Sequence, residues 1–326
     1  MADSNAELRL GTRGSQLALW QANAVAARLQ ETSGRSCRIV VIRTSGDRLQ
    51  DAPLSEVGGK RLFVKEIEDA LLRDEIDLAV HSSKDMPAIL PDGLTIGAVL
   101  PREDPLDAIV LPQKVEMSFN DVVAALGDSP LVGTSSVRRI AQLTRLFPRA
   151  RFTPIRGNLD TRLKKLDGGE YDAIVLAAAG LRRLGMGSRI SARVPSSVCV
   201  PAPGQGIVAI EIRKSDARAS AAVRSIDDRE SHAALDAERA VVEALGGGCQ
   251  TPIGALASTI ALDELELAAV VVSLDGTRAI SGMGHGKPAD AGAIGASVGA
   301  QLLADGAGDI LAEADRSRAA VEGIQP

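Results

Sequence analysis

The chain has 326 residues, of which 45% are hydrophobic and 24% charged, as is typical of a globular protein long enough for two or three domains. Its formal net charge of −5 and its 2% of aromatic residues argue against a general polyanion-binding protein and against a base-stacking surface for single-stranded nucleic acid. The three cysteines and three histidines are scattered rather than paired at metal-ligand spacings, which argues against a disulfide framework and against a metal site.

The first part of the chain alternates strand-like and helix-like segments. We expect strands at 7–10, 38–43, 77–80 and 95–100, and helices at 16–30 and 62–73. Ser15 is suited to cap the first of these helices. Residues 44–60 are polar and show neither the hydrophobic period of a helix nor that of a strand, so we expect a mobile loop there. No signal-type apolar core and no membrane-spanning stretch is expected, which favours a protein of the reducing cytoplasm.

A second series of strands and helices follows a proline-containing segment at 101–105. We expect strands at 108–111, 131–133, 151–155 and 173–177, and helices at 119–126, 137–146 and 159–166. Residues 200–206 form another segment rich in proline and glycine, followed by a strand at 207–213. Two such hinge-like segments around one block predict a chain that leaves a first domain and then returns to it.

The pattern changes near residue 224. A helix at 231–245 precedes three strands at hairpin spacing, 253–260, 265–274 and 278–284, and a helix at 291–303. The sequence therefore predicts an α/β protein with two βα domains, joined by two hinge crossovers, and a smaller C-terminal α+β domain with an antiparallel three-stranded sheet. The expected domains are 1–103 with 203–222, then 104–202, then 223–326.

Polar residues follow four of the expected strands, at the turns where helices begin. These turns are TRGS at 12–15, SSKD at 82–85, GTSS at 133–136 with two arginines behind it, and RGN at 156–158 with Arg162 behind it. Ligands of open α/β sheets bind at such turns, where helix N-termini present backbone N–H groups. Each turn alone is also typical of an ordinary helix start. Four of them favour an interdomain site for a ligand with several carboxylates or phosphates.

Asp85 differs from the other residues of these turns because it is acidic. A carboxylate among anion-binding groups suits a reaction that develops positive charge, and Lys84 beside it favours its ionised form. The alternative is a structural turn hydrogen bond before Pro87.

Cys249 follows three glycines, 246–248, at the end of an expected helix. A glycine run lets another group approach the backbone closely, so this thiol is expected to be exposed and reactive. The alternative is a helix end with a bystander cysteine. Cys37 and Cys199 lie in strand-like runs and are expected to be inert core thiols.

Eight runs of residues occur in the order and at the spacing of one enzyme family. They are GTRGSQLALWQ (11–21), VGGKRLFVKE (57–66), AVHSSKDMP (79–87), VGTSSVRR (132–139), RGNLDTR (156–162), AAGLRRL (178–184), PGQG (203–206) and GGCQTPIG (247–254). Through these runs the chain resembles the porphobilinogen deaminase family, also called hydroxymethylbilane synthases, over nearly its whole length. The resemblance thins only in the last part of the third domain.

The resemblance implies a cytoplasmic, monomeric transferase of tetrapyrrole biosynthesis whose first two domains resemble type II periplasmic binding proteins. It implies a dipyrromethane cofactor, attached through a thioether to Cys249, on which four porphobilinogen molecules are joined head to tail. Each addition loses ammonia and leaves a cationic methylene-pyrrolenine, and hydrolysis then releases linear hydroxymethylbilane. By the same resemblance, Asp85 hydrogen-bonds the pyrrole N–H groups and stabilises this cation. The implied partner is porphobilinogen, without nucleic acid, membrane or metal.

Matching positions give the remaining expected site residues. Besides Cys249, the positions expected to hold the cofactor are Ser82, Lys84, Thr134, Ser135, Ser136, Arg138, Arg139, Arg162, Arg183, Gln205 and Gly206. The positions expected to bind the substrate are Arg13, Ser15, Gln21, Lys60 and Arg156. One departure stands in the expected loop: family members often have a second basic residue where this chain has Glu56.

Three other functions fit parts of the pattern. A solute-binding protein would use the same turns but is expected to carry a secretion signal and leaves Cys249 without a role. A regulatory nucleic-acid-binding module could use residues 136–139, but the net negative charge of the chain argues against this function. A cysteine acyltransferase would need a histidine in a recognisable companion motif, and none is found.

Overall fold

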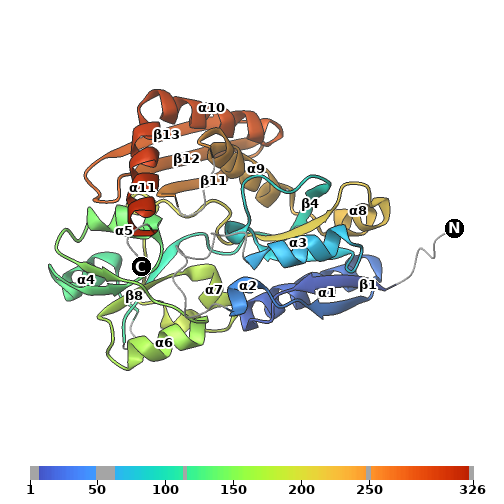
Figure 1. The fold of residues 1–326 in the computed structure, drawn as a ribbon, viewed down its shortest axis with the longest axis horizontal. Helices are drawn as coiled ribbons and strands as arrows, with labels where there is room; N and C mark the ends of the chain where they lie inside the picture. Colours follow the sequence, from blue (N-terminus) through green and yellow to red (C-terminus); the bar gives the residue numbers. More distant parts are fainter. Residues whose placement is uncertain (1–6, 49–62, 113–115, 247–250, 323–326) are drawn as a thin grey trace.

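The computed structural model describes residues 7–48, 63–112, 116–246 and 251–322. Figure 1 shows two sheet-containing units side by side, with a third unit packed against both of them. Among the described helices, none combines the length and the apolar character needed to cross a bilayer.

Five strands form the first sheet, in the order β2-β1-β3-β10-β4. Strand β1 pairs parallel with β2 and β3, whereas β10 runs antiparallel to β3 and β4. The strands are β1 (Leu8–Thr12), β2 (Cys37–Val41), β3 (Leu78–Ser82), β4 (Leu94–Val99) and β10 (Val208–Arg213). The accompanying helices are α1 (Gln16–Ser33), α2 (Ser45–Arg48), α3 (Lys65–Leu72) and α8 (Ala217–Val223).

Helices cover both faces of this sheet because its strands alternate two sets of buried side chains. Leu78 and Val80 of β3 pack in one core with α1, whereas Ala79 between them packs in another core with α3. Helix α1 begins where predicted, since the Ser15 hydroxyl accepts a hydrogen bond from the Ala18 N–H at 3.3 Å.

The second sheet repeats the strand order of the first. Its order is β7-β6-β8-β5-β9, with β5 antiparallel to both β8 and β9. The strands are β5 (Asp107–Val110), β6 (Leu131–Gly133), β7 (Arg151–Thr153), β8 (Ala173–Ala177) and β9 (Ala192–Arg193). The helices are α4 (Phe119–Leu126), α5 (Val137–Thr144), α6 (Leu159–Asp167) and α7 (Ala178–Arg183).

Two crossovers connect the two sheets, as predicted. The first crossover, residues 100–106, leads from β4 into β5, and the second crossover, residues 194–207, leads from β9 into β10. Each crossover therefore leads into the strand that runs antiparallel to its neighbours in the sheet: β5 in the second sheet and β10 in the first. This arrangement places the start of β5 next to the residues that precede β10, at the centre of the molecule.

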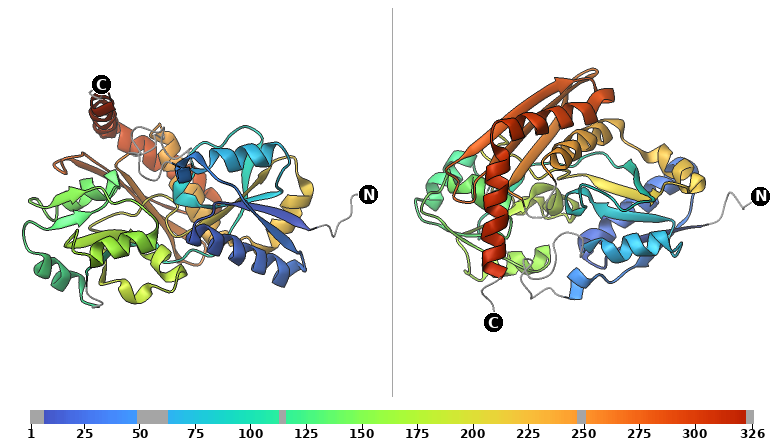
Figure 2. Two further views of the ribbon diagram at one scale, coloured as in Figure 1. Left: turned by 60° about the horizontal axis from the view of Figure 1, so that its bottom comes forward. Right: turned by 45° about the horizontal axis from the view of Figure 1, so that its top comes forward.

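The third unit is the predicted small α+β domain. Its antiparallel sheet has the order β11-β12-β13, and helices α9 and α10 pack together on it. Figure 2 shows this unit resting across the other two. Its elements are α9 (Arg229–Ala244), β11 (Ile253–Ala261), β12 (Glu264–Val272), β13 (Ala279–Gly286), α10 (Ala291–Ala304) and α11 (Ala307–Glu322). The α/β architecture with two βα domains and a C-terminal α+β domain is thus confirmed.

Several local predictions were wrong. A short helix, α2, occupies the start of the segment expected to be a loop, and α11 continues the chain beyond the helix that was expected to close it. Helices α7 and α8 and the two-residue strand β9 were not predicted. Cys199 lies in a bend of the second crossover rather than in a strand, although it is fully buried.

Candidate active site

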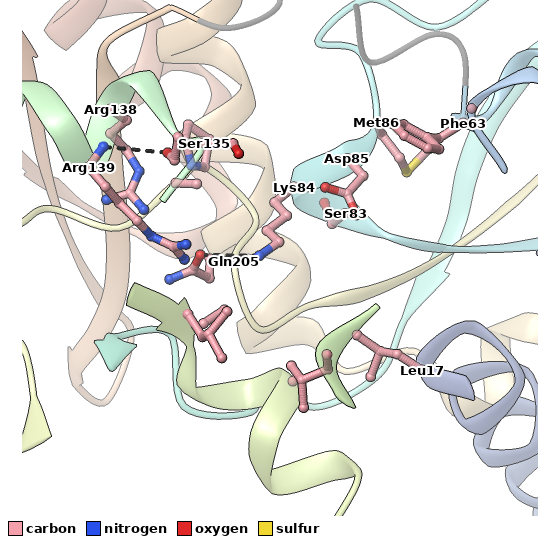
Figure 3. Close-up of a pocket in the computed structure, with 18 of the residues that line it drawn as sticks. Leu17, Phe63, Ser83, Lys84, Asp85, Met86, Ser135, Arg138, Arg139 and Gln205 are labelled. Atoms are coloured by element: carbon pink, nitrogen blue, oxygen red, sulfur yellow. Dashed lines mark hydrogen bonds between the residues drawn. The ribbon is translucent and has the colours of Figure 1, made fainter. Parts of the chain in front are cut away.

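A cavity of about 500 Å³ lies where all three units meet. Its walls include the turn after β3, the starts of helices α5 and α6, the second crossover, helix α9 and the start of β11. Figure 3 shows part of this lining. The predicted site residues in the cavity wall are Arg13, Ser15, Lys84, Asp85, Ser135, Ser136, Arg138, Arg139, Arg156, Arg162 and Gln205.

Asp85 is held on a short 3₁₀ turn (Ser83–Asp85) at the end of β3. The Ser83 N–H donates to the Ile207 carbonyl at 3.0 Å, and the Met86 N–H donates back to the Ser83 carbonyl at 3.1 Å. The turn is therefore tied to the second crossover. It presents the half-buried Asp85 carboxylate to the cavity from a rigid support.

Lys84 extends from the same turn toward the second crossover (Figure 3), and its Nζ lies 3.5 Å from the Gln205 Oε1. Burial lowers the pKa of Lys84 to about 8; the Asp85 carboxylate opposes this shift, while Arg139 and Arg138 add to it. The ammonium group is thus present below about pH 8 and is lost as the pH rises through that value.

Uptake of an anionic ligand by the cavity should depend on this titration. From about pH 7 to about pH 9 we expect binding of a carboxylate ligand to weaken, because Lys84 loses its charge near pH 8. The variant Lys84→Arg should remove this part of the decline, since a guanidinium stays protonated. The comparison is made by calorimetric titration at several pH values. An identical decline in both proteins would mean that another group titrates.

Serine and threonine side chains organise the turn before α5. Ser136 caps the helix by accepting a hydrogen bond from the Arg139 N–H at 3.4 Å. The Ser135 hydroxyl bonds to both the carbonyl and the N–H of Ile155, and the buried Thr134 hydroxyl accepts from the Ser136 N–H. These hydroxyls fix the start of α5, and with it the two arginines that follow.

Arg138 and Arg139 share one buried counter-ion, Asp107, the first residue of β5. Arg138 Nη1 lies 2.8 Å from Asp107 Oδ2, and Arg139 Nη2 lies 2.7 Å from Asp107 Oδ1. All three side chains are at most 8% exposed. Burial would raise the pKa of Asp107, but the two guanidinium groups outweigh it and hold that pKa well below its usual range. Asp107 is therefore ionised.

Two more arginines line the cavity at the start of α6. Arg162 donates from Nε to the Gly157 carbonyl at 2.8 Å, and burial, with Arg139 and Arg156 nearby, lowers its pKa to about 10. Burial also lowers the pKa of Arg156. Both groups remain cationic at neutral pH. Across the cavity, the Arg13 guanidinium lies 4.3 Å from the centre of the Phe63 ring.

Other predicted site residues lie outside the cavity wall. Ser82, Thr134, Gln21, Arg183 and Gly206 are not among the lining residues. Arg183 Nη2 donates to the Gly206 carbonyl at 2.6 Å, and its guanidinium lies 5.7 Å from the centre of the Trp20 ring. Gly206 has a φ of +88°, and a Cβ there would meet the Glu103 carbonyl at 2.2 Å, so it serves the contact between the crossovers.

Three positions singled out in the sequence lie outside the described residues: Lys60, Glu56 and Cys249. The chain after Cys249 is described from Thr251 onward, and both Thr251 and Ile253 line the cavity.

The structure adds residues that the sequence did not identify as part of the site. Asp107 stands at the boundary of an expected strand, and nothing in its neighbourhood in the sequence marks it as a partner of the arginines. Phe63 comes shortly after residues 44–60, which show no periodicity, and Arg239 lies in α9, whose cavity-facing side is not evident from the sequence. Phe63 and Arg239 line the cavity, and the Arg239 Nη2 donates a hydrogen bond to the Ala88 carbonyl.

The cavity wall is thus strongly basic, with seven cationic and two acidic side chains among the described residues. The cationic side chains of its wall are Arg13, Lys84, Arg138, Arg139, Arg156, Arg162 and Arg239, whereas Asp85 and Asp160 are its acidic ones within the described chain. Such a wall is suited in charge to a ligand with several carboxylates, and its Asp85 carboxylate is suited to a cationic reacting group.

Comparison with known proteins identifies one family. Residues 8–221 match the family model described as porphobilinogen deaminase, dipyromethane cofactor binding domain, and residues 233–304 match the C-terminal domain of porphobilinogen deaminase. The porphobilinogen deaminase of Pelotomaculum thermopropionicum is 47% identical, over 94% of this chain and 97% of its own. The porphobilinogen deaminase of Moorella thermoacetica is 46% identical, over 94% of this chain and 96% of its own. Among solved structures, immunogenic lipoprotein A from Vibrio vulnificus aligns with a TM-score of 0.40 and 14% identity, over 71% of this chain and 99% of its own.

Proposed function

Since this chain belongs to the porphobilinogen deaminase family, we propose that Cys249 carries its dipyrromethane cofactor and that Asp85 is its catalytic carboxylate. The enzyme is a transferase of tetrapyrrole biosynthesis. It joins four porphobilinogen molecules head to tail, with loss of ammonia, on a dipyrromethane primer and releases hydroxymethylbilane by hydrolysis. The observation that carries the assignment of residues is the basic cavity with Asp85 in its wall.

The residues of the cavity fit this cofactor. Each pyrrole ring bears an acetate and a propionate arm, so a two-ring group brings four carboxylates into the site. Arg138 and Arg139 are only 4% and 7% exposed, and the Arg138 Nε is buried without a hydrogen-bond partner within the described part of the chain. A donor in this state favours an anionic ligand, because an unsatisfied buried N–H is unfavourable. When bound, the dipyrromethane supplies the pyrrole carbon on which the chain grows.

The other proposed roles follow from position. The cofactor's carboxylate arms are held by Lys84, by Arg162 of α6, and by Ser135, Ser136, Arg138 and Arg139 at the start of α5. Arg13 and Ser15, in the turn before α1, bind the incoming substrate together with Arg156, in the turn before α6. The matching positions outside the cavity wall or outside the described residues keep the roles expected from the resemblance: Gln21, Lys60, Ser82, Thr134, Arg183 and Gly206.

Asp85 acts by electrostatics and hydrogen bonding. Its carboxylate faces the cavity from a turn that is fixed by the Ser83–Ile207 hydrogen bond, so it need not reorganise during the reaction. When ammonia leaves porphobilinogen, positive charge develops on the substrate ring. A fixed carboxylate that accepts a hydrogen bond from the pyrrole N–H lowers the energy of this cation.

We further propose the finer properties that the resemblance implies. The cofactor is attached by a thioether, and the enzyme is a cytoplasmic monomer that binds neither nucleic acid nor membranes. Its domains are 1–103 with 203–222, 104–202 and 223–326. Support for this division comes from the two crossovers, which contain the boundaries at 103/104 and 202/203.

Replacing Arg138 tests the proposed carboxylate site. We expect Arg138→Ala to slow assembly of the cofactor on the apoprotein by about 10- to 100-fold, because a charge-assisted hydrogen bond to a carboxylate is lost. The rate is measured by intact mass after porphobilinogen is added. Arg189→Ala is the matched control, since Arg189 is a buried arginine of the same sheet unit that pairs with Asp167 outside the cavity. Equal rates for Arg138→Ala and wild type would refute this role.

A further inference from the structure

Asp107 occupies a position that the proposed function leaves without a role. Its carboxylate receives donors from two sides: Oδ1 accepts from Arg139 Nε at 3.0 Å and from Gln205 Nε2 at 2.9 Å, while Oδ2 lies 2.8 Å from Arg138 Nη1 and 3.4 Å from the Cys199 Sγ. The side chain is fully buried and does not line the cavity. It therefore acts only through its neighbours.

The first effect of these contacts is to fix both guanidinium groups. Arg139 donates Nε and Nη2 to Asp107 and Nη1 to the Val175 carbonyl, so its plane is held at both ends. Arg138 donates Nη1 to the Val200 carbonyl as well as to Asp107. Two adjacent buried cations repel each other, and a carboxylate between them removes this repulsion while leaving both side chains in the cavity wall.

The second effect is a link to the turn that carries Asp85. Gln205 Nε2 donates to Asp107 and to the Pro105 carbonyl, and Gln205 Oε1 lies 3.5 Å from Lys84 Nζ. In Figure 3, Gln205 lies between Lys84 on one side and the two arginines on the other. One amide thus joins the first crossover, the second crossover and the turn after β3.

The backbone of Asp107 is itself held firmly. It pairs with Ala177 in the register of β5 and β8, and its carbonyl accepts from the Val194 N–H at 2.8 Å. Cys199 completes the surroundings: burial raises the pKa of its thiol to about 12, so the S–H is retained and is oriented to donate to Asp107. Asp107 is a rigid anionic anchor rather than a mobile ion-pair partner.

We propose that Asp107 is a positioning residue of the reaction: it presets Arg138 and Arg139 for the carboxylates of the primer and connects them through Gln205 to Lys84. This inference rests on the proposed function, in which those basic side chains hold the cofactor. Without the Asp107 charge the guanidinium groups turn to other partners, and their donors no longer meet the carboxylate arms together.

The test compares two buried aspartates. Asp107→Asn is paired with Asp77→Asn, since Asp77 is 6% exposed, lies 2.8 Å from Arg9 and 3.8 Å from Arg213, and is outside the cavity. Apoprotein from cells that make no porphobilinogen is mixed with porphobilinogen, and the covalent mass gain is followed over time. We expect both variants to be less stable to heat, but only Asp107→Asn to assemble the primer more slowly, by about 10- to 100-fold.

A double variant separates positioning from general damage and covers a failure of Asp107→Asn to fold. Asp107→Asn with Arg139→Gln removes one charge of each sign and keeps the net charge of the buried cluster. If Asp107 acts through the arginines, Asp107→Asn should slow primer assembly by a smaller factor in the Arg139→Gln background, where only Arg138 is left to be positioned, than in the wild type. An equal or larger factor in the Arg139→Gln background, or a wild-type rate in Asp107→Asn, would overturn the proposal. A wild-type apoprotein that gains no two-unit adduct would instead refute the proposed function itself.

Discussion

Replacing Asp85 with asparagine is expected to reduce turnover by a factor of about 10²–10³ or more while the protein remains folded. Asparagine keeps the size of the side chain and can still accept a hydrogen bond, so the loss measures the negative charge. Because Asp85 is half-buried on a turn whose backbone hydrogen bonds do not involve its side chain, the thermal midpoint should change little. The measurement is the initial rate of hydroxymethylbilane formation by enzyme that already carries its cofactor.

Asp160 provides the matched control for this experiment. It is the other acidic residue of the described cavity wall, and it lies in the first turn of α6. Asp160→Asn changes the charge of the cavity by the same amount, but it leaves the turn after β3 intact. We expect it to lower turnover by no more than about tenfold, as for a screened charge at a distance. Similar losses in the two variants would show that the charge of the cavity, rather than the position of Asp85, matters.

The parts of the site that follow strand ends were predictable from the sequence. Ser136 caps α5 and Ser15 caps α1 because short-range rules decide these contacts: a hydroxyl before a helical pattern bonds to an N–H three residues later. The prediction that the turns after parallel strands face one ligand site follows from topology, since the carboxyl ends of parallel strands meet at one edge of a sheet.

Asp107 shows why the other parts of the site could not be predicted from the sequence. Its partners Arg139, Cys199 and Gln205 are 32, 92 and 98 residues away in the sequence. Arg139 reaches Asp107 through the packing of α5 in the same sheet unit, and Cys199 and Gln205 reach it from the second crossover. A single aspartate at a strand boundary reads as a turn residue when its long-range contacts are unknown. The same limit applies to Arg239, whose orientation toward the cavity depends on how α9 packs.

Helices α8 and α11 were not predicted for a different reason, the weakness of their local sequence signals. Helix α8 is short, and its strongest signal is the Asp216 cap that accepts from the Ala219 N–H at 2.8 Å. Helix α11 follows α10 after a two-residue break at which Gly306 adopts a φ of +98°. A pattern of alanines with scattered charges, as in α11, carries little periodicity, because alanine is compatible with both buried and exposed faces.

Replacing Cys249 with serine is expected to abolish both the covalent cofactor and turnover. A thiolate is a far better nucleophile than a hydroxyl group near neutral pH, so serine should not form the corresponding bond. The carboxylate-binding side chains remain in this variant, and it should still bind porphobilinogen without retaining it through denaturation. Cys37→Ser is the control, because Cys37 is half-buried in β2 and burial, with Glu7 and Asp77 nearby, raises the pKa of its thiol to about 11.

The intact mass of the denatured protein tests the attachment of the primer at Cys249 most directly. Wild type and Cys37→Ser should exceed the mass of the chain by two porphobilinogens less two ammonias, either as purified or after porphobilinogen is added, whereas Cys249→Ser should show the mass of the chain alone. An excess that persists in Cys249→Ser would place the cofactor elsewhere. A wild-type protein that never gains the excess would contradict the covalent primer altogether.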